Sequence, residues 1–281
     1  MREGSVDVSN RIFDMVETIN CEPQSGSKDI EEKEQVLDEL ADAVMDINEA
    51  NNFCSGTNAK PIIELILHAP PSLQWRAAEV VANCVQNNPA AQEYFMQAGI
   101  MDPLMLLLEN DDLMCQIKAL LALSCMVREY RPACEWFSHR CGIQKVEAIL
   151  KSTDEFRLQR KCLALVDTVL CASSCLKVDT NNIDTSIYVG LVANSTSSEL
   201  RMAALSILTR LVQYQKSSLS YDDLALLLTI KGEGKVAENE TMLEEEQLMV
   251  KDLQTLLNAE MLFRRDENQS KEILLIKAPD M

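Results

Sequence analysis

Apolar residues recur three and four positions apart along most of the chain, which is the spacing of one face of an α-helix. Between residues 29 and 50, Leu37, Leu40 and Val44 belong to such a stripe, and acidic residues lie between them. The pattern predicts an amphipathic helix with an acidic outer face. Residues 1–30 are polar around one short apolar patch. We expect them to form a flexible N-terminal segment with no more than two helical turns.

Two segments of the chain match each other at one fixed distance. Residues 88–100 and residues 131–143 share a proline, an alanine, an aromatic residue, a glycine and an isoleucine at corresponding positions, 43 residues apart. A period of this length is typical of helical solenoid repeats. The sequence therefore predicts an armadillo-like array of repeats.

Each repeat carries signals for the ends of its helices. Asn88 is a natural N-cap for a helix that begins at Pro89, where the missing N–H is not needed. We expect Gly99 and Gly142 to end that short first helix in a left-handed conformation. The dipeptide Asp102–Pro103 then predicts the start of a second helix, and an acidic turn after it leads into a long third helix.

The third helices share a basic residue at one recurring position. Arg76, Lys118, Lys161 and Arg201 follow one another at distances of 42, 43 and 40 residues. About four three-helix repeats are therefore expected, between residues 55 and 230. The fourth lacks the proline and glycine signals, as terminal repeats often do.

These patterns predict an all-α protein, an armadillo-type α-solenoid of about four three-helix repeats with flanking helices. The repeat domain with its N-terminal acidic helix is expected to span residues 31–230. Residues 231–265 are expected to form a linker and a C-terminal acidic helix of about twenty residues, and residues 266–281 a loose tail.

Composition narrows the range of partners. The chain of 281 residues has 26 Lys and Arg against 44 Asp and Glu, a formal net charge of −18. Such a charge repels nucleic-acid phosphates and anionic lipid surfaces. The start of the chain lacks the apolar core of a signal peptide, and no stretch approaches the ~20 apolar residues of a membrane span. We expect a cytoplasmic monomer with neither a nucleic acid nor a membrane as partner.

The residue types of catalytic and metal sites are sparse. His68 and His139 are the two histidines, and the ten cysteines lie mostly within apolar helical runs without a Cys-x-x-Cys pair. Cys84 and Cys125, at matching places in consecutive third helices, are interpreted as small packing residues. The sequence predicts no enzyme activity, no metal and no cofactor.

Three segments carry a resemblance to a known family. The run from Trp75 to Pro89, with 40–53 before it and 119–129 after it, resembles the Fes family of nucleotide exchange factors, which includes the heat-shock protein 70-binding proteins. The similarity covers about residues 35–175. It implies a curved repeat domain that embraces one lobe of the nucleotide-binding domain of cytosolic heat-shock protein 70 and promotes ADP release.

A solenoid without a catalytic site usually binds its partner on the concave face, which the third helices form. Trp75 is either an anchor in that face or a wedge between repeats, and the recurring basic residues either pair with an acidic partner or support the core. The resemblance places the partner contact on this face. Its candidate contact residues are Arg76, Asn83, Asn87, Lys118, Arg128, Glu129 and Arg160.

Two other functions are compatible with the fold. One is a generic armadillo scaffold that binds a different protein on its concave face. The other is a transport adaptor of the importin type, which grips an extended basic peptide with a row of asparagine amides. Cys84, Cys125, Thr168 and Arg210 occupy the positions where those amides are needed, and these side chains cannot replace them.

Overall fold

The structure, a computed structural model, describes residues 3–20, 27–172, 182–214, 235–237, 240–241 and 244–259. These residues are helical almost throughout, apart from turns and a small antiparallel ribbon of β1 (Lys235–Ala237) and β2 (Glu240–Thr241). They fall into two compact units. The first comprises Met1–Gly142 with Asp154–Ala172, and the second comprises Ile143–Thr153 with Ser173–Met281.

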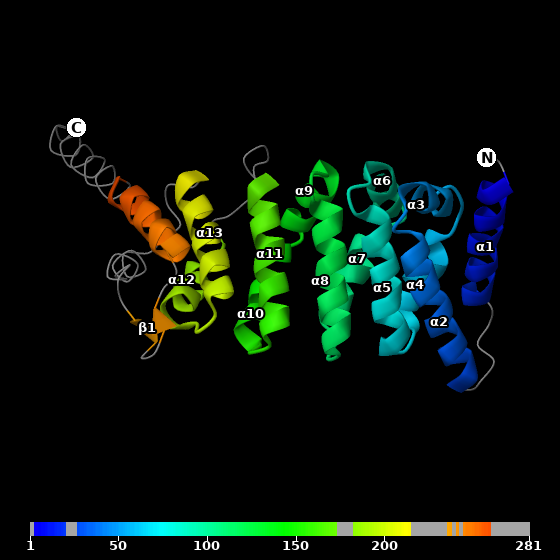
Figure 1. Ribbon diagram of the computed structural model, residues 1–281, viewed down its shortest axis with the longest axis horizontal. Helices are drawn as coiled ribbons and strands as arrows, with labels where there is room; N and C mark the ends of the chain where they lie inside the picture. The colour runs from blue at the N-terminus through cyan, green and yellow to red at the C-terminus, as the bar shows by residue number, and fades with distance from the viewer. Residues whose placement is uncertain are drawn as a thin grey trace, which may run out of the picture. The chain divides into compact units, whose positions relative to one another are not determined.

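Two shorter helices followed by a long one recur along the chain, as the sequence repeat predicts (Figure 1). In the first unit the long helices lie side by side, each against the next. The three complete triplets are α3 (Ile47–Phe53), α4 (Ala59–His68) and α5 (Pro71–Val85); α6 (Pro89–Gln97), α7 (Met101–Leu107) and α8 (Leu113–Val127); and α9 (Arg131–His139), α10 (Gly142–Ser152) and α11 (Phe156–Ala172).

The fourth repeat contributes two helices to the described residues, α12 (Thr185–Asn194) and α13 (Ser198–Tyr214). Residues 173–181, which precede α12, lie outside the described ranges. The expected all-α succession of helices is thus confirmed. The domain boundaries at residues 30, 230 and 265 stay predictions, and the loose tail expected at 266–281 lies outside the described residues.

Small and branched apolar residues fill the core of the first unit. Ala77, Ala78 and Val81 of α5 are completely buried or nearly so, which lets the neighbouring helices approach closely. Cys84 is also fully buried and Cys125 is 8% exposed, and burial raises the pKa of both thiols. Both cysteines are free, as expected for packing residues.

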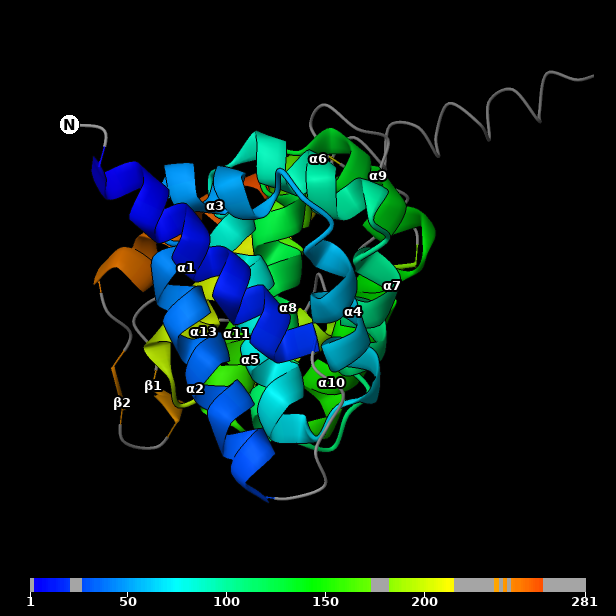
Figure 2. The ribbon, with the colours of Figure 1, turned by 90° about the vertical axis from the view of Figure 1, so that its right-hand side faces the viewer.

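The N-terminal region differs from the expectation of at most two helical turns. Helix α1 (Glu3–Asn20) has 18 residues and packs on α2 (Ser27–Ala43), α3 and α4 (Figure 2). Ile12, Met15 and Ile19 are buried in this contact. The short apolar patch of the sequence is the buried stripe of a longer helix whose stability comes from packing.

The acidic helix expected between residues 29 and 50 is two helices. Helix α2 ends at Ala43, and α3 begins at Ile47. Between them, the Asp46 carboxylate accepts hydrogen bonds from the backbone N–H groups of Asn48 (2.8 Å) and Glu49 (3.3 Å). An N-cap of this kind starts a new helix and interrupts the preceding one, although the apolar spacing continues across the break.

Two of the helix-end signals are confirmed and two are wrong. Asn88 accepts a hydrogen bond from the Ala91 N–H, and Gly99 has a φ of 83°. Gly142, however, is the first residue of α10, and the left-handed residue is Cys141 with a φ of 56°. Helix α7 begins at Met101, so that Asp102 lies in its first turn instead of capping it.

The reason for glycine at position 142 is close packing. A Cβ atom there would lie 2.5 Å from the Phe137 ring, which is fully buried. Real Cβ atoms do not approach other heavy atoms so closely, and a ring fixed in the core has little room to move. Glycine is therefore required at 142 for space and not for a left-handed backbone.

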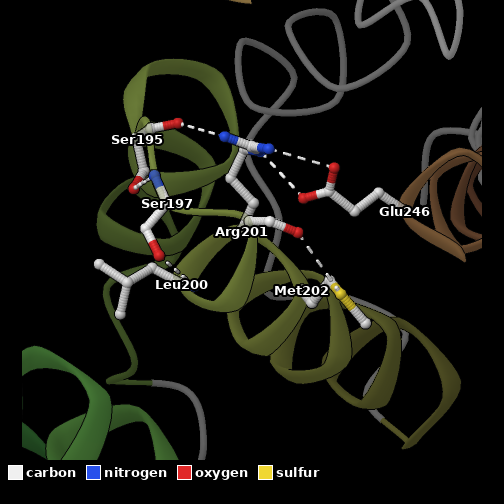
Figure 3. Close-up of polar contacts among 7 residues, drawn as sticks. Ser195, Ser197, Leu200, Arg201, Met202 and Glu246 are labelled. Carbon is white, nitrogen blue, oxygen red and sulfur yellow. Dashed lines mark hydrogen bonds and ion pairs between the residues drawn. The ribbon is translucent and has the colours of Figure 1, made fainter. Parts of the chain in front are cut away.

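In the second unit, residues 244–259 form the expected C-terminal helix (Figure 1). Its Glu246 carboxylate accepts hydrogen bonds from Nε and Nη2 of Arg201 on α13, at 3.0 and 3.1 Å (Figure 3). Nη1 of Arg201 donates to the Ser195 carbonyl at 2.8 Å. Both charged side chains are buried, and Val250, Leu253 and Leu257 of the same helix are buried with them.

Candidate partner-binding face

The seven candidate contact residues all lie on α5, α8 and α11 or on the turns that follow α5 and α8. We call the surface that these three helices and two turns form the third-helix face; Figure 1 shows its helices side by side in the first unit. The structure places the seven side chains in three different situations: some join helices to one another, some shape the turns, and some border a hollow.

Arg76 joins α5 to α2. Its Nε lies 2.9 Å from Oδ1 of Asp38 and its Nη1 lies 3.6 Å from Oε1 of Glu34. The guanidinium also lies over the Trp75 ring, 4.1 Å from the ring centroid, an arrangement that favours a cation. Only 17% of the Arg76 side chain is exposed, so its charge is used within the molecule.

Lys118 joins α8 to α5 in the same way. Its ammonium forms a hydrogen-bonded ion pair with Glu79 and lies 5.7 Å from the centroid of the Trp75 ring. Asn83 has a comparable role, because its Nδ2 donates to the carbonyl of Ala41, in the last turn of α2, at 2.9 Å. That carbonyl has no partner within its own helix. Arg76, Asn83 and Lys118 therefore hold the repeats together.

Asn87 and Glu129 form corresponding turns of consecutive repeats. Each has a φ of 54°, in the left-handed region that asparagine tolerates and glutamate rarely adopts. The turn after α8 is held by Gln92 of α6, whose buried amide donates to the carbonyls of Cys125 (2.8 Å) and Arg128 (3.0 Å). These contacts fix the backbone from which the exposed Arg128 side chain projects.

A hollow of about 130 Å³ opens between the turn that follows α5, helix α8 with the turn after it, and α11. Lys161 of α11 and Arg128 contribute its cations, and Asn87 and Ser124 contribute neutral polar groups. Neither cation forms an ion pair with a described residue. We call this site the Lys161 hollow. Its lining residues are Gln86, Asn87, Leu120, Leu121, Ser124, Cys125, Arg128, Lys161 and Ala164.

The two charged side chains that line the hollow, Arg128 and Lys161, are both cations. Burial lowers the pKa of the Lys161 ammonium, and the charge of neighbouring Arg160 lowers it further. Lys118 and Arg157 act in the same direction, and the Cys125 thiol acts in the opposite one. In a chain with a net charge of −18, this part of the third-helix face is a local concentration of positive charge.

The structure thus brings Asn87 and Arg128 together at one hollow and places exposed Arg160 close by. Lys161 and Gln92 were not among the candidate residues. The 43-residue repeat marks Lys161, because it occupies the recurring basic position. Nothing in the sequence marks Gln92, whose function depends on contacts 33 to 36 residues away.

Similarity to solved structures defines the class of the fold. A designed armadillo repeat protein, solved in complex with the peptide (KR)4, matches 87% of this chain and 98% of its own with a TM-score of 0.68 at 14% identity. An engineered protein matches 88% of this chain and 97% of its own with a TM-score of 0.70 at 15% identity. The chain is an all-α, armadillo-type helical repeat protein.

The sequence relationship is more specific. The family described as the SIL1/FES1/HPBP1 C-terminal domain matches residues 49–189, half of the chain, which includes α5, α8 and α11. The chain belongs to this family, and the predicted resemblance is confirmed. None of the helices in the described ranges is both long and apolar enough to cross a membrane.

Two relatives illustrate the relationship. Hsp70-binding protein 1 of Rattus norvegicus is 36% identical over 103 residues, which are 36% of this chain and 29% of the relative. The Hsp70 nucleotide exchange factor FES1 of Yarrowia lipolytica is 30% identical over 143 residues, which are 50% of this chain and 51% of the relative. The matched part of the chain therefore spans about half of these proteins or less.

Proposed function

We propose that this protein is a co-chaperone that binds an Hsp70 chaperone and promotes the release of its nucleotide. The observation that carries the proposal is the family membership, together with relatives whose names describe Hsp70 binding and Hsp70 nucleotide exchange. The matched residues 49–189 include all seven candidate contact residues and the Lys161 hollow. The third-helix face is the proposed contact surface.

The proposed mechanism is thermodynamic linkage. A protein that binds the nucleotide-free Hsp70 nucleotide-binding domain more tightly than the ADP-bound form lowers the affinity for ADP by the same factor. Such a protein acts by binding as a monomer and needs no catalytic group or cofactor. A cytosolic Hsp70 is the partner that the sequence predicts, and localisation in the cytoplasm stays a prediction.

The observed face opposes the importin-like alternative. Cys84 and Cys125 occupy two of the positions that need asparagine amides, and both are buried. Arg128 and Lys161 give the face a positive charge, which repels a basic peptide such as the one bound by the designed armadillo protein. An acidic or mixed protein surface fits these charges better.

A nucleotide-release experiment tests the proposal. A cytosolic Hsp70 is loaded with fluorescent ADP, chased with excess ATP, and followed by the loss of fluorescence with and without this protein. We expect faster ADP release at stoichiometric amounts. Arg128→Glu should weaken the acceleration, because it reverses an exposed charge on the proposed contact face. Arg131→Glu, an exposed charge reversal on α9, is the matched control and should act like the wild type.

If ADP release is unchanged and the two proteins do not co-elute in gel filtration, Hsp70 is not the partner. The chain would then be an armadillo scaffold for another protein. If the wild type and both variants accelerate release equally, Hsp70 exchange stands and the contact lies elsewhere than at Arg128.

A further inference from the structure

The recurring basic residues of the third helices form a series of ion pairs between neighbouring repeats. Arg76 of α5 pairs with Asp38 of α2, and Lys118 of α8 pairs with Glu79 of α5. In each case the carboxylate lies on the long helix that comes before the helix of the basic residue in the chain. The rule predicts that Lys161 of α11 should pair with a carboxylate of α8.

That carboxylate is missing. The position of α8 that corresponds to Glu79, one 42-residue repeat later, is Leu121. Leu121 lines the hollow beside Lys161 and offers no charge. No ion pair of Lys161 exists within the described residues. Of the titratable groups that act on its pKa, Arg160, Lys118 and Arg157 are cations, and Cys125 is a thiol whose own pKa is raised by burial.

The hollow has the size and lining of a carboxylate site. Its volume of about 130 Å³ exceeds the ~10–15 Å³ that one buried water needs. Arg128 supplies a planar guanidinium, which suits a carboxylate, and Ser124 supplies a hydroxyl donor. Asn87, held in its left-handed turn, lines the same space with an amide.

We propose that the Lys161 hollow receives the carboxylate of an aspartate or glutamate side chain on the bound partner protein, which completes the third ion pair of the series. This inference rests on the proposed function for the identity of the partner, the Hsp70 nucleotide-binding domain. Among the described residues this half-buried cation has no counter-ion, and the partner supplies it. Such a pair favours binding because the cation is already partly desolvated before the partner arrives.

A first experiment tests the hollow without Hsp70. Leu121→Glu places a carboxylate at the missing position, and Lys161→Met removes the cation while keeping an apolar stem. Urea unfolding of the wild type, both single variants and the double variant forms a double-mutant cycle. If the hollow accepts a carboxylate, Leu121→Glu should destabilise the protein that keeps Lys161 less than the protein that carries Lys161→Met. The decrease in the folding equilibrium constant should be roughly tenfold smaller when Lys161 is present. Equal effects in both backgrounds would overturn the proposal.

A second experiment measures affinity for the isolated nucleotide-binding domain of a cytosolic Hsp70. Leu121→Glu should fill the hollow from within and weaken binding at least roughly tenfold, and Lys161→Met should do the same by removing the cation. Lys60→Met is the control, because it changes the net charge by the same one unit at an exposed position of α4 outside the hollow. Its affinity should match that of the wild type.

The outcomes separate the two proposals. Wild-type binding that both hollow variants retain would overturn the carboxylate site and leave the Hsp70 function intact. Absence of wild-type binding would overturn the Hsp70 function, and the double-mutant cycle would still decide whether the hollow takes a carboxylate. A loss of affinity in Lys60→Met equal to that in Leu121→Glu would show an effect of overall charge and overturn the site.

Discussion

The same recurring position carries a lysine in α8 and in α11, and the two lysines differ in what surrounds them. Lys118 has Glu79 as its partner, whereas Lys161 has a leucine at the corresponding place and several cations nearby. Lys118 therefore stabilises the scaffold, whereas Lys161 destabilises the isolated protein. Replacing each lysine with methionine should therefore change the free energy of unfolding in opposite directions.

Lys161→Met should stabilise the protein at pH 7 by about 0.5–1 kcal/mol, because it removes a partly buried cation that repels its neighbours. Lys118→Met should destabilise it by about 1 kcal/mol, because Glu79 loses its partner. Urea unfolding at pH 7 measures both changes. A loss of stability in Lys161→Met equal to that in Lys118→Met would show that Lys161 is a structural residue.

The pH dependence has a definite sign. The pKa of Lys161 is lowered in the folded protein, so the unfolded chain binds more protons between the two pKa values. The stability of the wild type relative to Lys161→Met should therefore rise as the pH increases through the folded pKa towards the ordinary value of 10.5. A difference that stays constant with pH would contradict the depressed pKa.

Gln92 offers a second test at this scale. Its buried amide satisfies several carbonyls at the end of α8, so Gln92→Ala leaves them without partners and should cost about 1–3 kcal/mol in unfolding free energy. Gln97→Ala, at an exposed position of the same helix, should stay within about 0.5 kcal/mol of the wild type. Thermal or urea unfolding of the pair provides the comparison, and similar losses in both variants would show that the amide does not cap α8.

At the scale of elements, the sequence predicts a helix end correctly where that end depends on the chemistry of neighbouring residues. Asn88 and Gly99 fulfil the roles that their residue types predict, since a cap and a left-handed turn involve only a few neighbouring residues. The break at Asp46 was missed because the apolar stripe of α2 continues in phase into α3. Gly142 was misinterpreted because its requirement comes from the Phe137 ring, a packing contact that the chain pattern does not reveal.

The site was predictable to a similar extent. The repeat period identifies the third-helix face and places Asn87 and Arg128 on it, where they border the hollow. It does not distinguish a paired cation from an unpaired one, because the partners of Arg76 and Lys118 lie 38 and 39 residues away on other helices. Arg76, Asn83 and Lys118 are consequently occupied within the protein.

One buried ion pair and three buried apolar side chains attach the C-terminal helix, and the contribution of the ion pair can be tested. Glu246→Ala leaves the Arg201 guanidinium buried without its counter-ion, a change that typically costs ~3–5 kcal/mol. We expect residues 244–259 to lose protection from hydrogen exchange, while the helices of the first unit keep theirs. Glu245→Ala, an exposed neighbour in the same helix, is the control and should leave the exchange pattern unchanged. Unaltered protection in Glu246→Ala would show that apolar contacts alone hold the helix.

At the scale of the whole molecule, the distribution of charge matters more than its sum. The chain has a net charge of −18, yet Arg128, Arg160 and Lys161 gather on the third-helix face. Opposite signs on different surfaces orient an approaching partner before contact is made. A partner with an acidic patch is attracted to this face, whereas the net negative charge of the chain repels it.

The association rate with the Hsp70 nucleotide-binding domain should therefore fall as ionic strength rises from about 0.01 to about 0.15 M, over which the screening length shortens severalfold. Stopped-flow or surface-based kinetics can follow it. The dissociation rate should change less, because charges within the contact are screened less than exposed ones. An association rate that rises with salt would indicate that repulsion by the acidic surface dominates the encounter.

The Arg201–Glu246 pair also bears on how such a chain can evolve in length. Arg201 occupies the recurring basic position, but its carboxylate comes from a later segment of the chain, whereas those of Arg76 and Lys118 come from earlier ones. A duplicated repeat inserted after α13 would have to separate Arg201 from Glu246 or provide another acid. The direction of this single ion pair therefore constrains growth at this end of the array, whereas a repeat duplicated before α13 leaves the pair intact.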